Sequence, residues 1–158
     1  MRIRENPHMK KTAPYLRQLL LIRSEWMEDR LMANAAKRGY ADITPAMARL
    51  FAYLAGKPVA LSDLARKLSV SRQAVHKLAL ESARMGYVEF ITSETDARVK
   101  LLKFTTKGRN MSLTAENDLI EIERVLAKQL GSERMHLLKE ALATPWSSED
   151  KDRRRTET

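Results

Sequence analysis

The chain has 158 residues, of which 44% are apolar, and it carries a formal charge of +9 with an isoelectric point near 10.0. This apolar fraction excludes a disordered chain, and the absence of cysteine excludes a disulfide framework, a thiolate zinc site and a cysteine redox switch. A small chain this basic usually meets a polyanion, either nucleic acid or an anionic membrane surface, although the charge could also serve solubility alone.

The first part of the chain predicts an arm followed by a long helix. Residues 1–11 are polar and basic, and we expect them to form a flexible arm. Pro14 suits the first turn of a helix, and apolar residues then recur at helical spacing until Gly39 offers a C-terminal cap. The pattern predicts a helix over residues 13–38.

The same region contains neither a membrane span nor a secretory signal. The longest purely apolar run, Leu19–Ile22, is far shorter than a bilayer requires, and Arg17 and Arg23 interrupt any longer apolar segment. We therefore expect a cytoplasmic protein with no membrane partner.

A second helix begins at Thr44-Pro45, where a capping hydroxyl precedes a proline at the first helical position. Its buried side is expected to carry Met47, Leu50, Phe51 and Leu54. The helix should stop at Gly56-Lys57-Pro58, and Val59-Ala60 could form a very short strand.

Two shorter helices, Ser62–Leu68 and Ser71–Met85, are separated only by Ser69-Val70, and each opens with a serine placed to cap it. Gly86 ends the second helix, and the apolar period then changes to two. The pattern predicts strands over 88–91 and 101–104, joined by a charged stretch too long for a tight turn.

The last third of the chain predicts two more helices. One runs over residues 106–130, where Gly131-Ser132 pairs a C-terminal cap with a new N-cap, and the other ends near Ala143. Residues 147–158 are almost entirely polar and should form a disordered tail. The fold class is mainly α with a small β-hairpin.

The stretch from Leu61 to Val88 fits a helix-turn-helix, in which a small residue must stand where the two helices cross. Ala65 takes the crossing position, Val70 should fill the turn, and Ser69 stands where glycine is common. The remaining apolar offsets of the motif are occupied by Leu64, Leu68, Val75 and Leu78. An ordinary helical hairpin could match the same pattern.

The outward side of the second helix favours DNA. It carries hydrogen-bonding side chains and no acid before Glu81, whereas a merely solvated face would mix both signs. Arg72 could make the bidentate contact to guanine, and Gln73 the one to adenine. The predicted DNA contacts here are Ser62, Ser69, Ser71, Arg72, Gln73, His76 and Lys77.

The charged stretch between the two strands adds an independent signal. Arg98 and Lys100 sit at and just after its tip, and Lys103 and Lys107 follow. A cationic β-loop beside a recognition helix can enter the neighbouring minor groove, where arginine is attracted by concentrated negative potential. Residues 57–107 hold ten basic and five acidic residues, so +5 of the total charge of +9 lies where DNA contact is predicted.

At this point the chain resembles the MarR family of bacterial regulators over about residues 12–143. The residues that carry the resemblance are Thr44-Pro45, Leu61-Ser62-Asp63-Leu64-Ala65, Val70-Ser71-Arg72-Gln73-Ala74-Val75, Leu80, Gly86-Tyr87-Val88, Asp96-Ala97-Arg98, Leu102, Thr105 and Gly108. The wing pattern is the most selective part. There the chain departs from the family, with Ser93-Glu94-Thr95 in place of a more usual Asp/Pro-rich approach.

The resemblance implies a winged helix-turn-helix homodimer that binds double-stranded DNA and regulates transcription as a repressor, with the nucleoid as its place when bound. Arg98 matches the family's wing-tip arginine, and Asp96 matches the acid that steadies it. The expected organisation is one domain over 12–146, with a core at about 44–105 and dimerisation helices at about 13–38 and 106–143.

The apolar residues of the first and last helices also favour a dimer. The first and last helices carry more apolar surface than a small DNA-binding core can cover, namely Leu16, Leu19, Leu20, Leu138 and Leu142. A larger monomeric core would be the alternative.

The resemblance further implies a small aromatic effector, bound between the dimerisation helices and the DNA-binding lobe. Residues that could line its pocket are Trp26, Met27, Arg49, Phe51 and Tyr53. At helical spacing such residues could equally belong to the core.

Other functions were weighed against the same residues. His8, His76 and His136 are too scattered for a metal site, and no catalytic triad, P-loop or glycine-rich nucleotide motif is present, so we expect neither an enzyme nor a cofactor. A second alternative is a winged helix used for protein interaction. The charges of the wing and the recognition helix argue against it, because a protein-binding surface would be expected to show aromatic anchors there. Sequence-tolerant architectural DNA binding remains open, and the ratio of specific to random binding would distinguish it.

Overall fold

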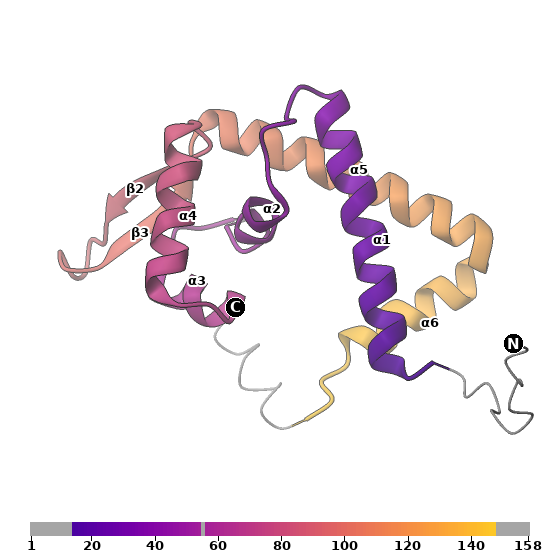
Figure 1. Cartoon of the computed structure of the whole chain (residues 1–158). Coiled ribbons are helices and arrows are strands. Elements are labelled where there is room, and N and C mark those ends of the chain that lie inside the picture. The colour runs from indigo at the N-terminus through magenta and orange to yellow at the C-terminus, as the bar shows by residue number, and fades with distance from the viewer. Residues whose placement is uncertain (1–13, 55, 148–158) are drawn as a thin grey trace, which may run out of the picture. The chain divides into compact units, whose positions relative to one another are not determined.

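The computed structural model describes residues 14–54 and 56–147 (Figure 1). In this part of the chain the elements are α1 (Leu16–Lys37), α2 (Pro45–Ala52), β1 (Val59–Ala60), α3 (Leu61–Leu68), α4 (Arg72–Arg84), β2 (Val88–Thr92), β3 (Lys100–Phe104), α5 (Thr106–Leu130) and α6 (Ser132–Ala143). The predicted fold class is confirmed, and each predicted element is present. The predicted arm lies outside the described residues, as does the predicted tail beyond Ser147.

Contacts divide the chain into two compact units, one through Ser112 and one from Leu113, and the boundary falls inside α5. The first unit contains the helix-turn-helix, the sheet and the core. None of the helices in the described part of the chain combines the length and the apolar character that crossing a bilayer requires.

The start of α2 follows the predicted capping pattern. The Thr44 side-chain oxygen accepts a hydrogen bond from the Met47 backbone N–H at 3.2 Å, and Pro45 occupies the first turn. The helix ends at Ala52, earlier than the glycine at 56 predicted, yet Leu54 beyond it is still buried.

The turn between α3 and α4 corrects one prediction and explains another. Ser69 adopts the left-handed conformation with φ 54°, which is why glycine is common at this position. Val70 does not fill the turn, because 45% of its surface is exposed. Ala65 is buried at the crossing, as predicted, and its carbonyl accepts a hydrogen bond from the Val70 N–H at 3.0 Å.

One of the three predicted serine caps is confirmed, and two are wrong. The Ser71 hydroxyl accepts from the Ala74 N–H at 3.1 Å and caps α4, as expected. The prediction for Ser62 is wrong, because β1 runs directly into α3 and Ala60 is the N-cap. The prediction for Ser132 is also wrong, since Gly131, with φ 87°, takes the N-cap of α6.

A three-stranded antiparallel sheet in the order β1-β3-β2 supports the wing. Val88 pairs with Phe104 and Phe90 with Leu102. Because side chains alternate across a strand, these four residues share the inner face of the hairpin, and Glu89 and Lys103 lie on its outer face.

The core of the first unit lies between α2, α3, α4 and the inner face of the hairpin. Its buried residues are Ile43, Met47, Leu50, Phe51, Leu54, Leu64, Ala65, Val75, Ala79, Tyr87, Val88, Leu102, Phe104 and Met111. Phe51 contacts the rings of Tyr87 and Phe104, with centroids 5.8 and 5.6 Å apart. This packing fixes the base of the hairpin against α2.

A junction of polar contacts joins the end of α4 to the start of α5. The Thr105 hydroxyl donates to the Gly86 carbonyl at 2.6 Å, and the Lys107 ammonium donates to the Met85 carbonyl at 2.7 Å. Gly108 packs so closely that a Cβ there would stand 1.9 Å from the Tyr87 carbonyl oxygen. The junction therefore satisfies carbonyls that the end of α4 leaves without helical partners.

The second unit contains most of α5 and all of α6. Lys139 forms an ion pair with Glu123 at 2.6 Å, and Arg124 pairs with Glu121. In α6 the exposed apolar residues are Leu137, Leu138 and Leu142. They leave this helix with an apolar surface that the described chain does not cover.

Candidate nucleic-acid interface

The N-terminal end of α4 projects its polar residues into solvent. Arg72 and Gln73 directly follow the capping Ser71, occupy the first turn of α4 and are both exposed. The free N–H groups of this turn carry partial positive charge, which favours an anion such as a phosphate. The Ser71 oxygen is used in the cap, and its hydroxyl hydrogen can still be donated.

The basic residues of this region divide by whether they have a partner. Lys103 pairs with Glu89 at 3.2 Å on the outer face of the hairpin, and the Lys107 ammonium lies 4.2 Å from the centre of the Tyr87 ring. Both of these cations are therefore engaged within the protein.

Four other cations have no such partner. Among the described residues, no ion pair or hydrogen bond engages the charged groups of Arg72, Lys77, Arg98 and Lys100, and all four residues are exposed. These are the four basic residues predicted to contact DNA. Their charge is available to an external anion.

The wing tip is held by local hydrogen bonds. The Asp96 carboxylate accepts from the Arg98 backbone N–H at 2.9 Å, so this acid fixes the turn rather than the guanidinium. The Ser93 N–H donates to the Val99 carbonyl at 3.0 Å, and the Ser93 and Thr95 hydroxyls are 3.0 Å apart. Ser93 and Thr95, which depart from the family pattern, thus help to close the loop together with Asp96 and Val99.

His76 takes a position different from the other predicted contacts. Its imidazole lies 6.0 Å from the Phe90 ring, centroid to centroid, with the planes 42° apart. It therefore contacts the wing strand β2 rather than standing alone in solvent.

The two remaining predicted contacts flank the turn. Ser62 and Ser69 are both exposed, on α3 and at its C-terminal end. Between them Asp63 pairs with Arg66, so the one acid of α3 is neutralised within the helix. Neither serine is occupied by a cap, and both hydroxyls are available.

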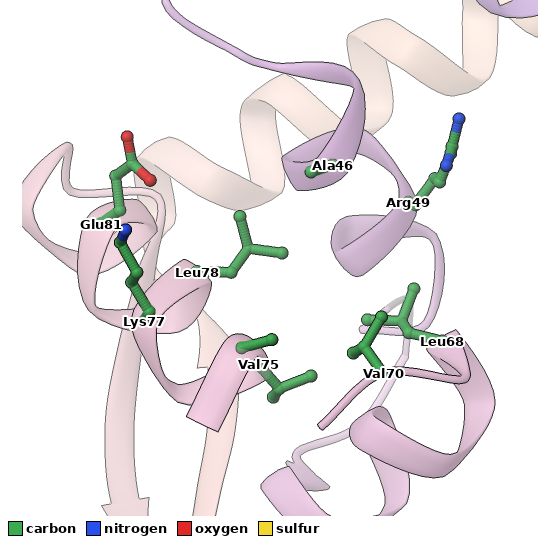
Figure 2. A pocket seen from close by; sticks show the side chains of 9 residues that line it. Ala46, Arg49, Leu68, Val70, Val75, Lys77, Leu78 and Glu81 are labelled. Carbon is green, nitrogen blue, oxygen red and sulfur yellow. The ribbon is translucent and has the colours of Figure 1, made fainter. Parts of the chain in front are cut away.

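A pocket of about 320 Å³ lies behind the recognition surface, between α2 and the helix-turn-helix (Figure 2). Its lining residues are Ala46, Arg49, Leu68, Val70, Ala74, Val75, Lys77, Leu78 and Glu81. The apolar members surround the space, and three charged side chains lie at its borders. Four of the lining residues on α4, at 74, 77, 78 and 81, recur at helical spacing, and this signal was overlooked in the sequence.

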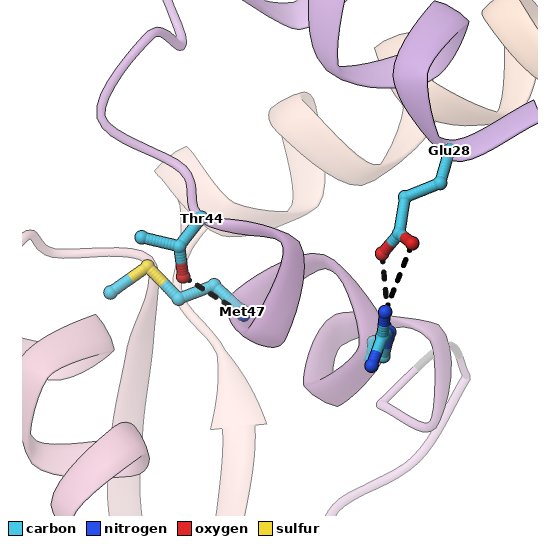
Figure 3. A network of polar contacts seen from close by, with 4 residues as sticks. Glu28, Thr44 and Met47 are labelled. Carbon is cyan, nitrogen blue, oxygen red and sulfur yellow. Dashed lines mark hydrogen bonds and ion pairs between the residues drawn. The ribbon is translucent and has the colours of Figure 1, made fainter. Parts of the chain in front are cut away.

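Arg49 is the one residue of the predicted effector pocket that borders this space. Its Nε and a terminal nitrogen donate to the two Glu28 carboxylate oxygens at 3.1 and 3.0 Å, which joins α2 to α1 (Figure 3). The hydrogen bond to Glu28, reinforced by its charge, raises the pKa of the Arg49 guanidinium above its ordinary value. The Arg49 guanidinium therefore stays charged at every working pH.

The other four predicted pocket residues lie elsewhere. Phe51 belongs to the buried core, and Tyr53 is exposed, with the Lys67 ammonium 5.4 Å from the centre of its ring. Trp26 and Met27 are half-buried on α1, where the Arg30 guanidinium lies 4.5 Å from the Trp26 ring centre.

Taken together, the surface offers donors and unpaired cations on α4 and the wing, beside two exposed acids of the wing loop, Glu94 and Asp96. Such a set suits phosphates and base edges. No cluster of three or more metal-ligating side chains occurs among residues 14–54 and 56–147.

Comparison with known proteins agrees with this geometry. A model of the MarR family matches residues 41–99, which span α2, the helix-turn-helix and the wing up to the loop. Among curated proteins no significant match was found.

Solved structures share the fold over most of the chain. Apo MarR from E. coli is 21% identical with a TM-score of 0.67, and covers 83% of this chain and 96% of its own. A complex of S. aureus MepR with DNA is 21% identical with a TM-score of 0.65, covering 82% and 95%. NadR in complex with 4-hydroxyphenylacetate is 24% identical with a TM-score of 0.67, covering 87% and 96%.

The family model and the fold agree with the helix-turn-helix and wing described above. The chain therefore has the winged helix-turn-helix fold of the MarR structures, and its residues 41–99 match the MarR family model.

Proposed function

We propose that this chain binds double-stranded DNA sequence-specifically as a homodimer and represses transcription from a pseudo-palindromic site. The observation that carries the proposal is the set of four cations, Arg72, Lys77, Arg98 and Lys100, that the protein itself leaves without partners. They lie on the recognition helix and the wing, the two elements that this fold presents to DNA. The wing loop also carries two exposed acids, Glu94 and Asp96, but Asp96 accepts from the Arg98 backbone and does not pair with the Arg98 guanidinium.

Each residue of the surface has a role that its chemistry suits. Arg72 and Gln73, in the first turn of α4, would read guanine and adenine in the major groove. Arg98, at the tip of the wing, would enter the adjacent minor groove, where its charge is attracted most strongly. The remaining contacts would go to phosphates, from Ser62, Ser69, Ser71, Lys77 and Lys100.

Lys100 has additional support from the sheet. It lies on β3 at alternate positions from the buried Leu102 and Phe104, so it belongs to the inner face of the hairpin. The inner face is the one on which α4 packs, as the contact between His76 and Phe90 indicates. Lys100 is thereby on the same side of the wing as the recognition helix.

The proposed dimer rests on apolar surface at both ends of the chain. In α1 Leu16, Leu21 and Ile22 are 59%, 49% and 51% exposed, and in α6 Leu137 is 54% exposed. Helices with several large apolar residues exposed in this way are uncommon on a monomer. Two copies related by a two-fold axis would present two recognition helices, with half-sites separated by roughly 34–36 Å.

Selection of bound sites from random duplex DNA tests the proposal directly. We expect an enriched sequence with two inverted half-sites one helical turn apart, and a preference over random DNA that persists at physiological salt. The MepR structure in complex with DNA supports this expectation for the fold. Enrichment of no sequence, even in dilute buffer, would contradict the proposal and favour architectural binding.

We further propose that a small aromatic anion regulates this binding from the pocket beside α4. The pocket is largely apolar, and at its border Lys77 is a cation without a partner among the described residues, whereas Arg49 is paired with Glu28 and Glu81 is an acid. Lys77 is also a proposed phosphate contact, so a ligand carboxylate that pairs with it would compete with DNA for the same ammonium. The complex of NadR with 4-hydroxyphenylacetate provides a probe of suitable size.

The test compares DNA affinity with and without 4-hydroxyphenylacetate. The probe should weaken binding by the wild-type protein, and Lys77→Met should abolish the probe's effect while lowering affinity on its own. Lys103→Met is the matched control, because that ammonium is already paired with Glu89. A probe effect of equal size in Lys77→Met would contradict the role of this pocket.

A further inference from the structure

We infer that His76 is a positioning residue, which sets the inclination of the wing against the recognition helix through Phe90, and does not read a base. This inference rests on the proposed DNA binding and assigns a role to one residue of the same surface. It changes the role that the sequence pattern indicated, because the pattern placed His76 among the DNA contacts.

The first observation is the ring contact itself. The imidazole and the phenyl ring are 6.0 Å apart between centroids and inclined by 42°, within the range in which aromatic pairs attract each other. Among the described residues, this is the one ring contact between α4 and the strands of the wing.

The second observation is where Phe90 lies. It is half-buried on β2, on the inner face of the hairpin, opposite Leu102 on β3 and two residues before the strand ends at Thr92. Phe90 packs against the core cluster. The contact therefore falls between the firmly packed base of the wing and its exposed tip, where a support most restricts the tilt of the hairpin.

The third observation is where His76 lies on α4. It follows the buried Val75 and is one helical turn beyond Arg72, on the same side of the helix. A side chain at the border between the buried and exposed faces can contact the strand while Arg72 points to solvent. The reading residue and the supporting residue are thereby separate but adjacent.

The role follows from the two-part shape of the surface. The recognition helix and the wing tip must enter neighbouring grooves at the same time, and a wing free to tilt would lose entropy on binding. A contact already formed in the free protein reduces that loss. It acts equally on every DNA sequence, because it does not touch a base.

The experiment measures affinity for the selected site, for the same site with single base changes, and for random DNA. His76→Ala and Phe90→Ala should each weaken binding by about 2- to 10-fold, the range that loss of one aromatic pair predicts. Preference at each base pair should stay as in the wild type. The double variant should be no weaker than either single variant, since both remove one contact.

Two further measurements distinguish positioning from mere structure. Protection of the minor groove beneath the wing from hydroxyl radicals should fall in both alanine variants while major-groove protection remains. His76→Phe should recover most of the lost affinity, because a phenyl ring can replace the contact but cannot hydrogen-bond a base. If Phe90→Ala fails to fold, Phe90→Leu, which keeps the apolar volume without the ring, takes its place.

The outcomes separate the inference from the function on which it rests. If the wild-type protein shows no preferred sequence, the proposed DNA reading fails. If the wild-type protein binds its site but His76→Phe is as weak as His76→Ala and loses preference at one base pair of each half-site, His76 reads a base and the inference is wrong. Multiplying losses in the double variant would also overturn it.

Discussion

Arg72 stands in the first turn of α4, exposed and without a partner, and its guanidinium could form two parallel hydrogen bonds to a guanine. Replacing it with alanine should weaken binding to the selected site by roughly 1–3 kcal/mol and relax the preference at one base pair of each half-site. Titration against the site and its single-base variants measures both effects.

Arg66→Ala provides the matched control for this prediction. Arg66 is also an exposed arginine of the helix-turn-helix, but its guanidinium pairs with Asp63. Its loss should leave base preference unchanged. An equal loss of affinity for specific and random DNA in Arg72→Ala would show that Arg72 contacts only phosphate.

Tyr87 makes the free energy of unfolding depend on pH in the alkaline range. Its hydroxyl donates to the Asp42 carboxylate at 2.8 Å, and burial, then this hydrogen bond and the negative charge of Asp42, raise the pKa of the phenol. The neutral phenol is the form that the folded state favours. Its contribution to stability is complete below the unfolded pKa of about 10 and is lost as the pH rises toward the higher folded value.

Tyr87→Phe should remove this dependence. At pH 8 the variant should lose about 1 kcal/mol of unfolding free energy, because the hydrogen bond is absent. Between pH 9 and pH 11 the free energy of the wild-type protein should fall more steeply than that of the variant. Urea unfolding at both ends of this range is the measurement, and parallel pH profiles would contradict the assignment.

At the residue scale, the sequence predicted which basic side chains would be exposed better than it predicted their partners. Arg98 and Lys100 were predicted as DNA contacts and have no partner among the described residues. Lys103 and Lys107 also entered the count of wing charge, but Glu89 and the Met85 carbonyl engage them. Those contacts depend on strand register and on residues far apart in the chain, which composition and spacing do not contain.

At the scale of elements, the cations of the wing differ in whether they are paired. Arg98 and Lys100 have no partner among the described residues, whereas Lys103 on the outer face pairs with Glu89. Arg98→Ala should weaken binding and lower the steepness of its salt dependence by about 0.9 per protomer if the guanidinium replaces one counterion. Affinity measured over a series of salt concentrations tests this.

Lys103→Ala is the control on the same hairpin. Its ammonium pairs with Glu89 on the outer face, so the slope of affinity against salt should match the wild type. An unchanged slope in Arg98→Ala would remove the wing tip from the proposed footprint.

The sequence predicted a helix start correctly where the capping hydrogen bond joins residues close together in the chain. Thr44 and Ser71 were predicted correctly because each oxygen bonds an N–H only three residues away. The cap predicted at Ser62 was wrong because β1 pairs with β3, and this pairing keeps the chain extended up to Leu61. A cap displaced by a distant strand cannot be seen in a local pattern.

At the scale of the whole molecule, the proposed homodimer can be tested by its mass and by substitutions on its apolar surface. Sedimentation at micromolar concentration should give twice the monomer mass of 18.1 kDa. Leu138→Glu, with Leu142→Glu as a second site, should shift the equilibrium to monomer by placing charge on apolar surface. Glu133→Lys on the same helix is a charge-changing control, and a wild-type monomer would count against the proposal.

The pocket beside α4 shows why a cavity cannot be predicted from spacing alone. The predicted effector site combined residues of α1 and α2, and Arg49 is the member that also borders this pocket, whose other lining residues come from α2, α3, α4 and the turn between them. Such a lining follows from how helices pack in space. The match to the MarR family model, by contrast, falls on residues 41–99, in which local motifs dominate.

The junction at the start of α5 has one more consequence. Thr105 and Lys107 hold neighbouring carbonyls at the end of α4, and Gly108 touches the Tyr87 carbonyl beside them. Any rotation of α5 about its own axis would strain all three attachments together. A movement of the first turn of α5 would therefore also move the end of α4, because these contacts link the two helices directly.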